Sequence, residues 1–293
     1  MRANTIGILF IILCRGFALA QQSGTLNLTF TTIDVPGAGE TNVAGINSNG
    51  DIVGWYSQAF NTSSSGFLLS GGTFTYLNYP GGYDTIAGGI NDAGVVVGNA
   101  YTSSEGAAGF TYQGGSFKTI QIAGYPDTYA EGIDNAGDIV GGYGFGSVNG
   151  FEQSGTKFRI VTPPCGQGSV AANAINNVGQ IVGWTYYNNH AGFLYQHGKY
   201  RTINVPNSLN YTVALGINDS GIVVGWYVGC APTCTEHGFV LKKGKYLSFD
   251  YPAATQTYAN GINNAGQIVG SYTLDGQTFH GFVSSPVADI DFQ

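Results

Sequence analysis

Short apolar runs alternate along the chain with turn residues, and the same arrangement recurs six times. One run in each repeat reads Gly-Ile-Asn, two residues, Gly, one residue, Ile/Val-Val-Gly, with small departures. The third residue of this phrase recurs every 42 to 45 residues, at Asn47, Asn91, Asp134, Asn176, Asn218 and Asn263. A period of this size, built from short strands, is typical of a β-propeller.

Each repeat predicts four strands. In the fifth repeat these are residues 212–218, 222–228, 237–242 and 245–252, separated by turn residues. In the Asn-x-x-Gly turn, the Asn side chain can cap the backbone and Gly can take a positive φ. Most fourth strands end at a proline, which lacks the N–H that a central strand needs, so we expect this strand outermost. The first strand, made of small residues, would then line the axis.

Ring closure requires one more outer strand than the repeats supply. Residues 30–35 and residues 287–292 both resemble that strand type, and we favour the N-terminal segment. Pairing strands from the two ends of the chain would remove a free sheet edge. The sequence thus predicts an all-β, six-bladed β-propeller of four-stranded antiparallel blades over residues 30–293, preceded by a short lead at 21–29. A β-solenoid is the alternative.

The first twenty residues predict a secretory signal peptide. Arg2 precedes an apolar stretch at 5–14, and Ala18-Leu19-Ala20 forms a small-residue cleavage site. About ten apolar residues are too few to span a bilayer, which takes roughly 20. A lipid anchor at Cys14 is a weaker alternative, since Leu13 stands where a small residue is expected. We expect cleavage after Ala20 and a secreted, cell-surface or periplasmic protein.

Composition narrows the classes of partner. The chain has 47 Gly, 19 Tyr and 17 Phe but only 9% charged residues, which fits turn-rich sheets with aromatic packing. The net charge is −7, and the largest basic cluster is Lys242-Lys243-Gly244-Lys245. Binding of nucleic acid needs a broader positive surface, so we do not expect nucleic acid as a partner. No motif for a cofactor or a phosphate is present.

Three cysteines remain after the predicted cleavage. Cys230 and Cys234 are close enough to form a loop disulfide, which an exported protein favours. A metal site is the alternative, although only His237 lies nearby in sequence as a further ligand. Cys165 would then be unpaired, unless the pairing is rearranged.

The recurring phrase, followed by a His-Ala-Phe or Gly-Phe strand, resembles the bacterial probable extracellular repeat family, also called HAF repeats. The resemblance covers nearly the whole mature chain. His237-Gly238-Phe239 and His280-Gly281-Phe282 come closest to the name-giving tripeptide, whereas three repeats carry Ser65, Ala108 and Asn149 in place of His. The resemblance implies bacterial export and a propeller-like repeat fold, and it implies no settled activity.

Aromatic and acidic residues supply the candidate sites. All three tryptophans, Trp55, Trp184 and Trp226, follow Val-Gly at one repeat position, where they could stack on sugar rings or simply pack between blades. Glu40, Asp84 and Asp127 share another repeat position, and Glu131 lies near the last of them.

These acids could bind a cation or act as general acids, or they could be loop carboxylates that accept hydrogen bonds from turn amides. The Asn/Asp-rich turns have too few carboxylates for most of them to be calcium loops.

Three functions remain open. The favoured one is a secreted binding module for a glycan or a protein, in which six-fold repetition can supply avidity. A carbohydrate-active hydrolase or lyase that uses Asp84, Asp127 or Glu131 is the first alternative. A structural extracellular protein is the second, because the fold alone does not select among these.

Overall fold

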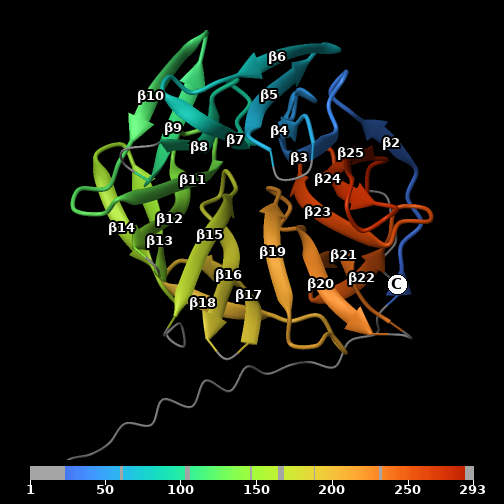
Figure 1. Ribbon diagram of the computed structural model, residues 1–293. Helices are drawn as coiled ribbons and strands as arrows, with labels where there is room; N and C mark the ends of the chain where they lie inside the picture. The colour runs from blue at the N-terminus through green and yellow to red at the C-terminus, as the bar shows by residue number, and fades with distance from the viewer. Residues whose placement is uncertain are drawn as a thin grey trace, which may run out of the picture.

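The computed structural model describes residues 24–59, 62–102, 106–145, 147–163, 168–187, 189–230 and 233–287. These residues form β-strands and no helix, arranged as six sheets around one axis (Figure 1). The predicted six-bladed β-propeller is therefore confirmed. Since the described part has no helix, it has none that is long and apolar enough to cross a membrane.

Each blade has four antiparallel strands, which run outward from the axis in chain order except in blade 6, whose outer strand comes from the N-terminal end of the chain. Blades 1 to 3 consist of β3 (Glu40–Ile46), β4 (Ile52–Ser57), β5 (Ser64–Ser70) and β6 (Thr73–Leu77); β7 (Gly82–Ile90), β8 (Val96–Thr102), β9 (Gly106–Gln113) and β10 (Ser116–Ile120); and β11 (Asp127–Ile133), β12 (Ile139–Phe145), β13 (Ser147–Ser154) and β14 (Lys157–Val161). Blades 4 to 6 consist of β15 (Ser169–Ile175), β16 (Ile181–Tyr187), β17 (Asn189–Gln196) and β18 (Lys199–Ile203); β19 (Thr212–Ile217), β20 (Val223–Cys230), β21 (Cys234–Lys242) and β22 (Lys245–Phe249); and β23 (Gln256–Ile262), β24 (Ile268–Thr273), β25 (Phe279–Ser284) and β2 (Phe30–Ile33).

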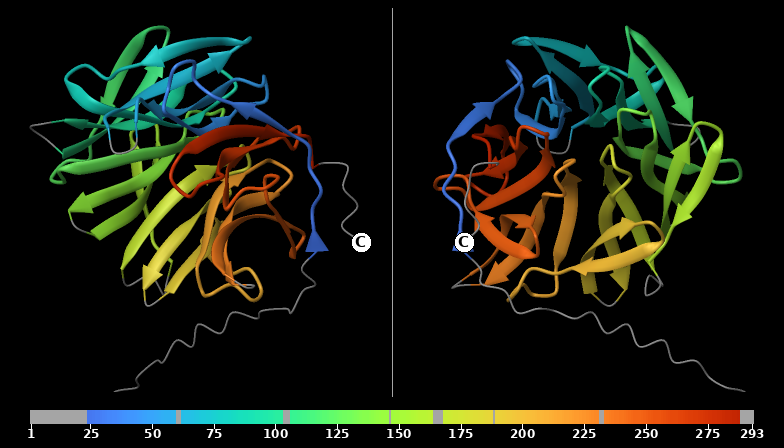
Figure 2. Two further views of the ribbon diagram at one scale, coloured as in Figure 1. Left: turned by 45° about the vertical axis from the view of Figure 1, so that its right-hand side comes forward. Right: turned by 180° about the vertical axis from the view of Figure 1, so that it is seen from behind.

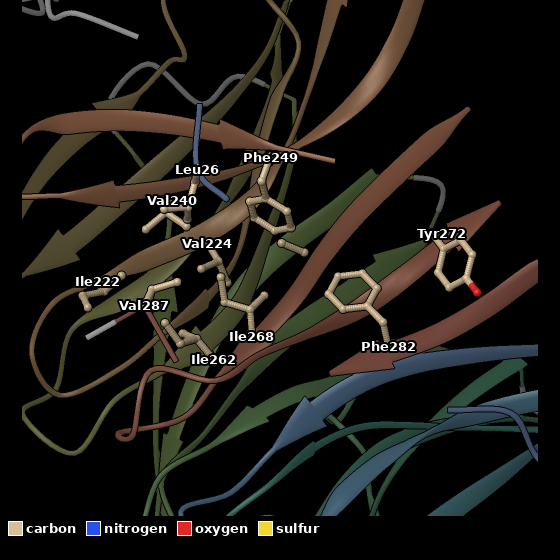
Figure 3. Close-up of a cluster of buried hydrophobic side chains, with 11 residues drawn as sticks. Leu26, Ile222, Val224, Val240, Phe249, Ile262, Ile268, Tyr272, Phe282 and Val287 are labelled. Carbon is tan, nitrogen blue, oxygen red and sulfur yellow. The ribbon is translucent and has the colours of Figure 1, made fainter. Parts of the chain in front are cut away.

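The N-terminal strand closes the ring. β2 pairs antiparallel with β25 and forms the outer strand of blade 6. In Figure 2 the blue N-terminal strand lies beside the red C-terminal blade. A further strand, β1 (Gly24–Thr25), pairs parallel with β22 of blade 5, so part of the predicted lead belongs to a sheet. The competing C-terminal strand lies outside the described residues except for Val287, which packs with Leu26 in the core between blades 5 and 6 (Figure 3).

A phenylalanine and a glycine form the core of every blade. The Phe of each Gly-Phe pair is at most 2% exposed, at Phe67, Phe110, Phe151, Phe193, Phe239 and Phe282. It faces the Gly of Val-Gly on the neighbouring strand; a Cβ at Gly183, for example, would lie 2.8 Å from the ring of Phe193. The same Cβ would also overlap Ala171 O on the inner strand, so the repeated glycine is needed because backbone and ring together fill the space of a side chain.

The Asn of Gly-Ile-Asn does two jobs. Its Oδ1 accepts turn N–H groups, as predicted; Asn47 Oδ1 accepts from Asn49 N (3.0 Å) and Asp51 N (2.9 Å). Its Nδ2 donates to the carbonyl of the equivalent residue in the next blade, as Asn47 does to Asn91 (3.1 Å). This inter-blade bond recurs from Asn91, Asn176, Asn218 and Asn263, at 2.9–3.2 Å. We call this circle of inter-blade bonds the asparagine ring. Asp134 has no amide to donate at this position, so the asparagine ring is open between blades 3 and 4.

The β20–β21 hairpin is longer than the sequence indicated. β20 continues to Cys230 and β21 begins at Cys234, and these two cysteines form a disulfide at the hairpin tip. The sequence predicts these strands only over residues 222–228 and 237–242, with a variable loop between them. The predicted signal peptide, Cys14 and Cys165 lie outside the described residues.

Candidate functional site

The six inner strands run in the same direction along the axis, which gives the ring two different mouths. We call the end where these strands begin, near Glu40, the upper mouth, and the end with the Asn turns the lower mouth. A pocket of about 460 Å³ opens at the upper mouth between blade 1 and blade 6. It is lined by Glu40, Asn42, Trp55, Thr62, Ser64, Tyr258, Asn260, Ser271 and Phe279.

The polar side of the pocket has unused hydrogen-bonding capacity. Asn42 Nδ2 is buried and has no hydrogen-bond partner among the described residues. Glu40 is 9% exposed, and its Oε1 accepts a hydrogen bond from Ser57 Oγ (2.7 Å). Asn260 is held in place by the bond from its Nδ2 to Val43 O (2.7 Å) across the blade junction. A buried donor without a partner costs about 1–3 kcal/mol, which a ligand acceptor would recover.

The aromatic side of the pocket consists of Trp55, Tyr258 and Phe279, all half-buried. The ring centroids of Tyr258 and Phe279 are 5.9 Å apart. Phe279 follows a loop that Asp275 orders by accepting hydrogen bonds from the N–H groups of Gln277 (2.8 Å) and Thr278 (2.7 Å). These bonds hold the pKa of Asp275 below its usual value.

Sequence analysis found Glu40 and Trp55, and the structure brings them together in this pocket. It missed Asn42, Tyr258 and Phe279. A signal was present, because Trp55 and Ser271 occupy one repeat position and face Asn42 and Tyr258 across the inner strand pair. In blade 1 the large Trp55 on the second strand pairs with the smaller Asn42 on the inner strand, and in blade 6 the small Ser271 pairs with the large Tyr258.

The same rule places the other two tryptophans. Trp184 faces Ala171 in blade 4, and Trp226 faces Val213 in blade 5. Both lie at the level of the pocket, and Trp226 contacts Tyr258 with ring centroids 5.2 Å apart. The three tryptophans therefore lie on blades 4, 5 and 1, with Tyr258 of blade 6 between them.

Asp84 and Asp127 connect neighbouring blades. Asp84 Oδ1 accepts the N–H of Ser64 in blade 1 (2.6 Å), and Asp127 Oδ1 accepts the N–H of Ala107 in blade 2 (3.0 Å). Each carboxylate thus holds the beginning of the third strand of the preceding blade. Neither carboxylate lines the pocket, so only Glu40 of the acids at this repeat position does so.

Glu131 occupies a different place. It is the extra residue of a β-bulge in β11, half-buried between buried neighbours, and a Cβ on Gly88 would lie 3.3 Å from its Oε2. Burial raises the pKa of Glu131 to about 7. Its charge also contributes, together with those of Asp127 and Asp84, to the raised pKa of Tyr101, for which burial is the main cause.

The lower mouth has a different chemistry. A cavity of about 80 Å³ there is lined by the Ile-Asn-x residues of all six repeats. Asp92 accepts from Ser48 N (2.7 Å) and Asn135 Nδ2 (2.7 Å), so both of its oxygens bind turn amides of neighbouring blades. Within the described ranges, no group of three or more His, Cys, Asp or Glu could hold a metal ion. The turn carboxylates join blades to one another.

Comparison with known proteins finds no matching family model and no matching curated sequence. Solved propeller structures are similar in fold. TolB from Acinetobacter baumannii has a TM-score of 0.52 at 9% identity over 80% of this chain, and this chain spans only 63% of TolB. The β-propeller domain of the Trilobed protease from Pyrococcus furiosus has a TM-score of 0.50 at 10% identity, covering 86% of this chain and 85% of that one. At such identities the similarity shows the fold alone.

Proposed function

We propose that this protein is a binding module that takes a glycan in the pocket between blades 1 and 6. The observation that carries the proposal is the buried, unpartnered Asn42 Nδ2 in a pocket that also has aromatic side chains. Aromatic faces bind the apolar face of a sugar, while a few fixed polar groups orient its hydroxyls.

A hydrolase is less well supported. Glycoside hydrolysis by the usual mechanism needs two carboxyl groups on either side of the scissile bond. The pocket lining contains one carboxylate, Glu40, whereas Asp84 and Asp127 bind backbone N–H groups of neighbouring blades. Glu131 has the raised pKa expected of a general acid, but it is not among the residues that line the pocket.

We also propose that the chain is an exported bacterial protein of the HAF repeat type. The repeated Gly-Ile-Asn phrase and the signal-peptide pattern of residues 1–20 support this assignment. The Cys230–Cys234 disulfide adds support, since structural disulfides persist mainly in oxidising compartments.

Two pocket variants test the proposed function, after a glycan array has identified a ligand. Trp55→Ala removes a stacking surface and should weaken binding roughly 10- to 100-fold, which corresponds to about 1.4–2.7 kcal/mol. Asn42→Leu should weaken binding as well, yet raise the melting temperature, because it removes a buried donor without a partner. A purely structural role for Asn42 would not give these opposite changes.

The matched control is Tyr76→Ala, which removes an exposed tyrosine from the outer strand β6 and should leave binding unchanged. Calorimetric titration measures affinity and scanning calorimetry measures stability. The proposal fails if the folded wild-type protein binds no glycan on the array, or if Trp55→Ala and Asn42→Leu bind as tightly as wild type.

A further inference from the structure

An unbroken row of aromatic side chains leaves the pocket and crosses three blades. It begins at Phe279 and Tyr258 in the pocket and continues through Trp226, Tyr211 and His190 to Trp184 and Tyr186. Successive ring centroids are 3.9 to 5.9 Å apart. Six of the seven side chains are half-buried, and Tyr186 is 52% exposed.

The backbone fixes this row at the upper mouth. Trp184 and Trp226 pair with Ala171 and Val213, which lie near the starts of the inner strands β15 and β19, and Tyr258 lies near the start of β23. Tyr211 precedes β19 and forms an isolated β-bridge with His190 of β17, so it joins blade 4 to blade 5. The rings therefore make a continuous surface from blade 6 to blade 4.

The charges around the row are negative. Glu236 raises the pKa of both Tyr211 and Tyr258, in each case after the larger effect of burial, so its carboxylate lies within electrostatic range of the row. Glu40 adds a carboxylate in the pocket. The lysines and arginines that follow Arg15 all lie on outer strands or in the hairpins that lead into them, at Lys118, Lys157, Arg159, Lys199, Arg201, Lys242, Lys243 and Lys245. An anionic ligand would therefore meet repulsion at this mouth.

We propose that the ligand is a glycan chain of several neutral or amine-bearing sugar residues. This rests on the proposed function of the pocket. One end of the chain binds in the pocket, and the following residues stack along the aromatic row over blades 6, 5 and 4. Such a row adds affinity with each further sugar ring that it covers, because each contact buries apolar surface without new ordering of the protein.

A proline-rich peptide also binds aromatic grooves, but the polar groups here favour a glycan. The carboxylate of Glu40 lines the pocket and is an acceptor, which needs donors on the ligand. Proline has no N–H to supply, whereas sugars carry hydroxyl donors throughout. The Tyr and Trp residues add polar tips to the row, so the whole surface can exchange hydrogen bonds with hydroxyls.

The test is a chain-length series of the array-identified sugar, from one to six residues, measured by calorimetric titration. Wild-type affinity should rise with length. Tyr186→Ala, at the exposed far end of the row, should leave the shortest ligand unaffected and weaken the longest roughly 2- to 10-fold. Tyr76→Ala is again the matched exposed control.

The outcomes separate the two proposals. If the shortest ligand binds but affinity does not increase with length, or Tyr186→Ala has no effect on the longest, the chain proposal is overturned and the pocket function stands. If no glycan binds, the proposed function itself fails. Tighter binding of a polyuronate than of neutral or amino-sugar chains, or binding of a proline-rich peptide that depends on Tyr186, would also overturn the proposed ligand class.

Discussion

Replacing Asp134 by Asn should stabilise the protein by completing the asparagine ring. Five of the six repeats have an Asn whose Nδ2 donates to the carbonyl of the next blade. Asp134 is 7% exposed and keeps the other half of the pattern, with Oδ1 accepting from Ala136 N and Asp138 N at 2.9 Å each. The new amide should therefore point at the Asn176 carbonyl.

Repeat 1 shows that this geometry is available. There, Asn47 Nδ2 donates both to the next blade (3.1 Å) and to the carboxylate four residues on, Asp51 Oδ2 (2.9 Å). Repeat 3 has Asp138 at the equivalent place, and its charge now opposes that of Asp134. The substitution gains one or two hydrogen bonds at about 0.5–1.5 kcal/mol each, so we expect about 0.5–3 kcal/mol. At roughly 2–4 °C per kcal/mol, the melting temperature should rise by about 1–12 °C.

The gain should depend on pH. Burial is the main reason that the pKa of Asp134 is raised in the folded protein. The native state then binds a proton more tightly than the unfolded state, so the wild type loses stability as pH rises from the unfolded pKa through the folded one. The advantage of Asp134→Asn should therefore be largest at pH 8 and smaller at pH 4.

Thermal unfolding at both pH values measures this, and Asn218→Asp, which opens the ring elsewhere, should lower the melting temperature. A melting temperature for Asp134→Asn at or below that of wild type at pH 8, with Asn218→Asp destabilised, would refute the idea that Asp134 leaves a gap that an amide can fill.

Three other predictions follow from the same structure. Ser271→Trp should destabilise the protein and abolish glycan binding, because Tyr258 already fills the space opposite. Adding Tyr258→Val should recover about 0.5–3 kcal/mol of stability in a double-mutant cycle, while glycan binding stays abolished. Asp250→Asn should lower the melting temperature at pH 5.5 but not at pH 8.5: the hydrogen bond to Asp250 raises the pKa of His237, so its stabilisation is present below about 6.5 and lost as pH rises through the folded value. Glu131→Gln should stabilise at pH 8 and have little effect at pH 4, because the native pKa of about 7 makes ionisation costly; the gain should be at most about 3 kcal/mol, since the side chain is only half-buried.

The scaffold was predictable because its residues recur. The Asn/Asp-x-x-Gly turn occurs in all six repeats, a proline ends most outer strands, and the N-terminal segment resembles those outer strands. The inter-blade bond from the Asn amide was not predicted, because a turn motif shows its own cap but not the carbonyl it meets in another blade. The pairing of β1 with β22 was missed for a similar reason: two residues of a parallel strand carry no periodicity.

The pocket could not be predicted from the repeat, because it forms where the repeat is broken. At the junction of blades 5 and 6, Trp226 and Tyr258 are both large and touch. At the junction of blades 6 and 1, the repeat positions hold Ser271 and Asn42, which are too small to fill the same space, and a cavity remains. The two residues are more than 200 positions apart in the chain, so only ring closure brings them together.

Two residues that depart from the repeat, Asn42 and Asp134, lie beside cavities of different size. Asn42 leaves a buried donor unpartnered, which costs stability, and it faces a pocket large enough for a sugar residue. Asp134 also costs stability, but it borders only the small cavity at the lower mouth. A residue that costs stability is not by itself a sign of function, since selection removes only substitutions that bring the protein below the stability it needs. What distinguishes the two residues is the space beside them: Asn42 lines a pocket of about 460 Å³, whereas Asp134 lines a cavity of about 80 Å³, so only Asn42 has room for a ligand beside it.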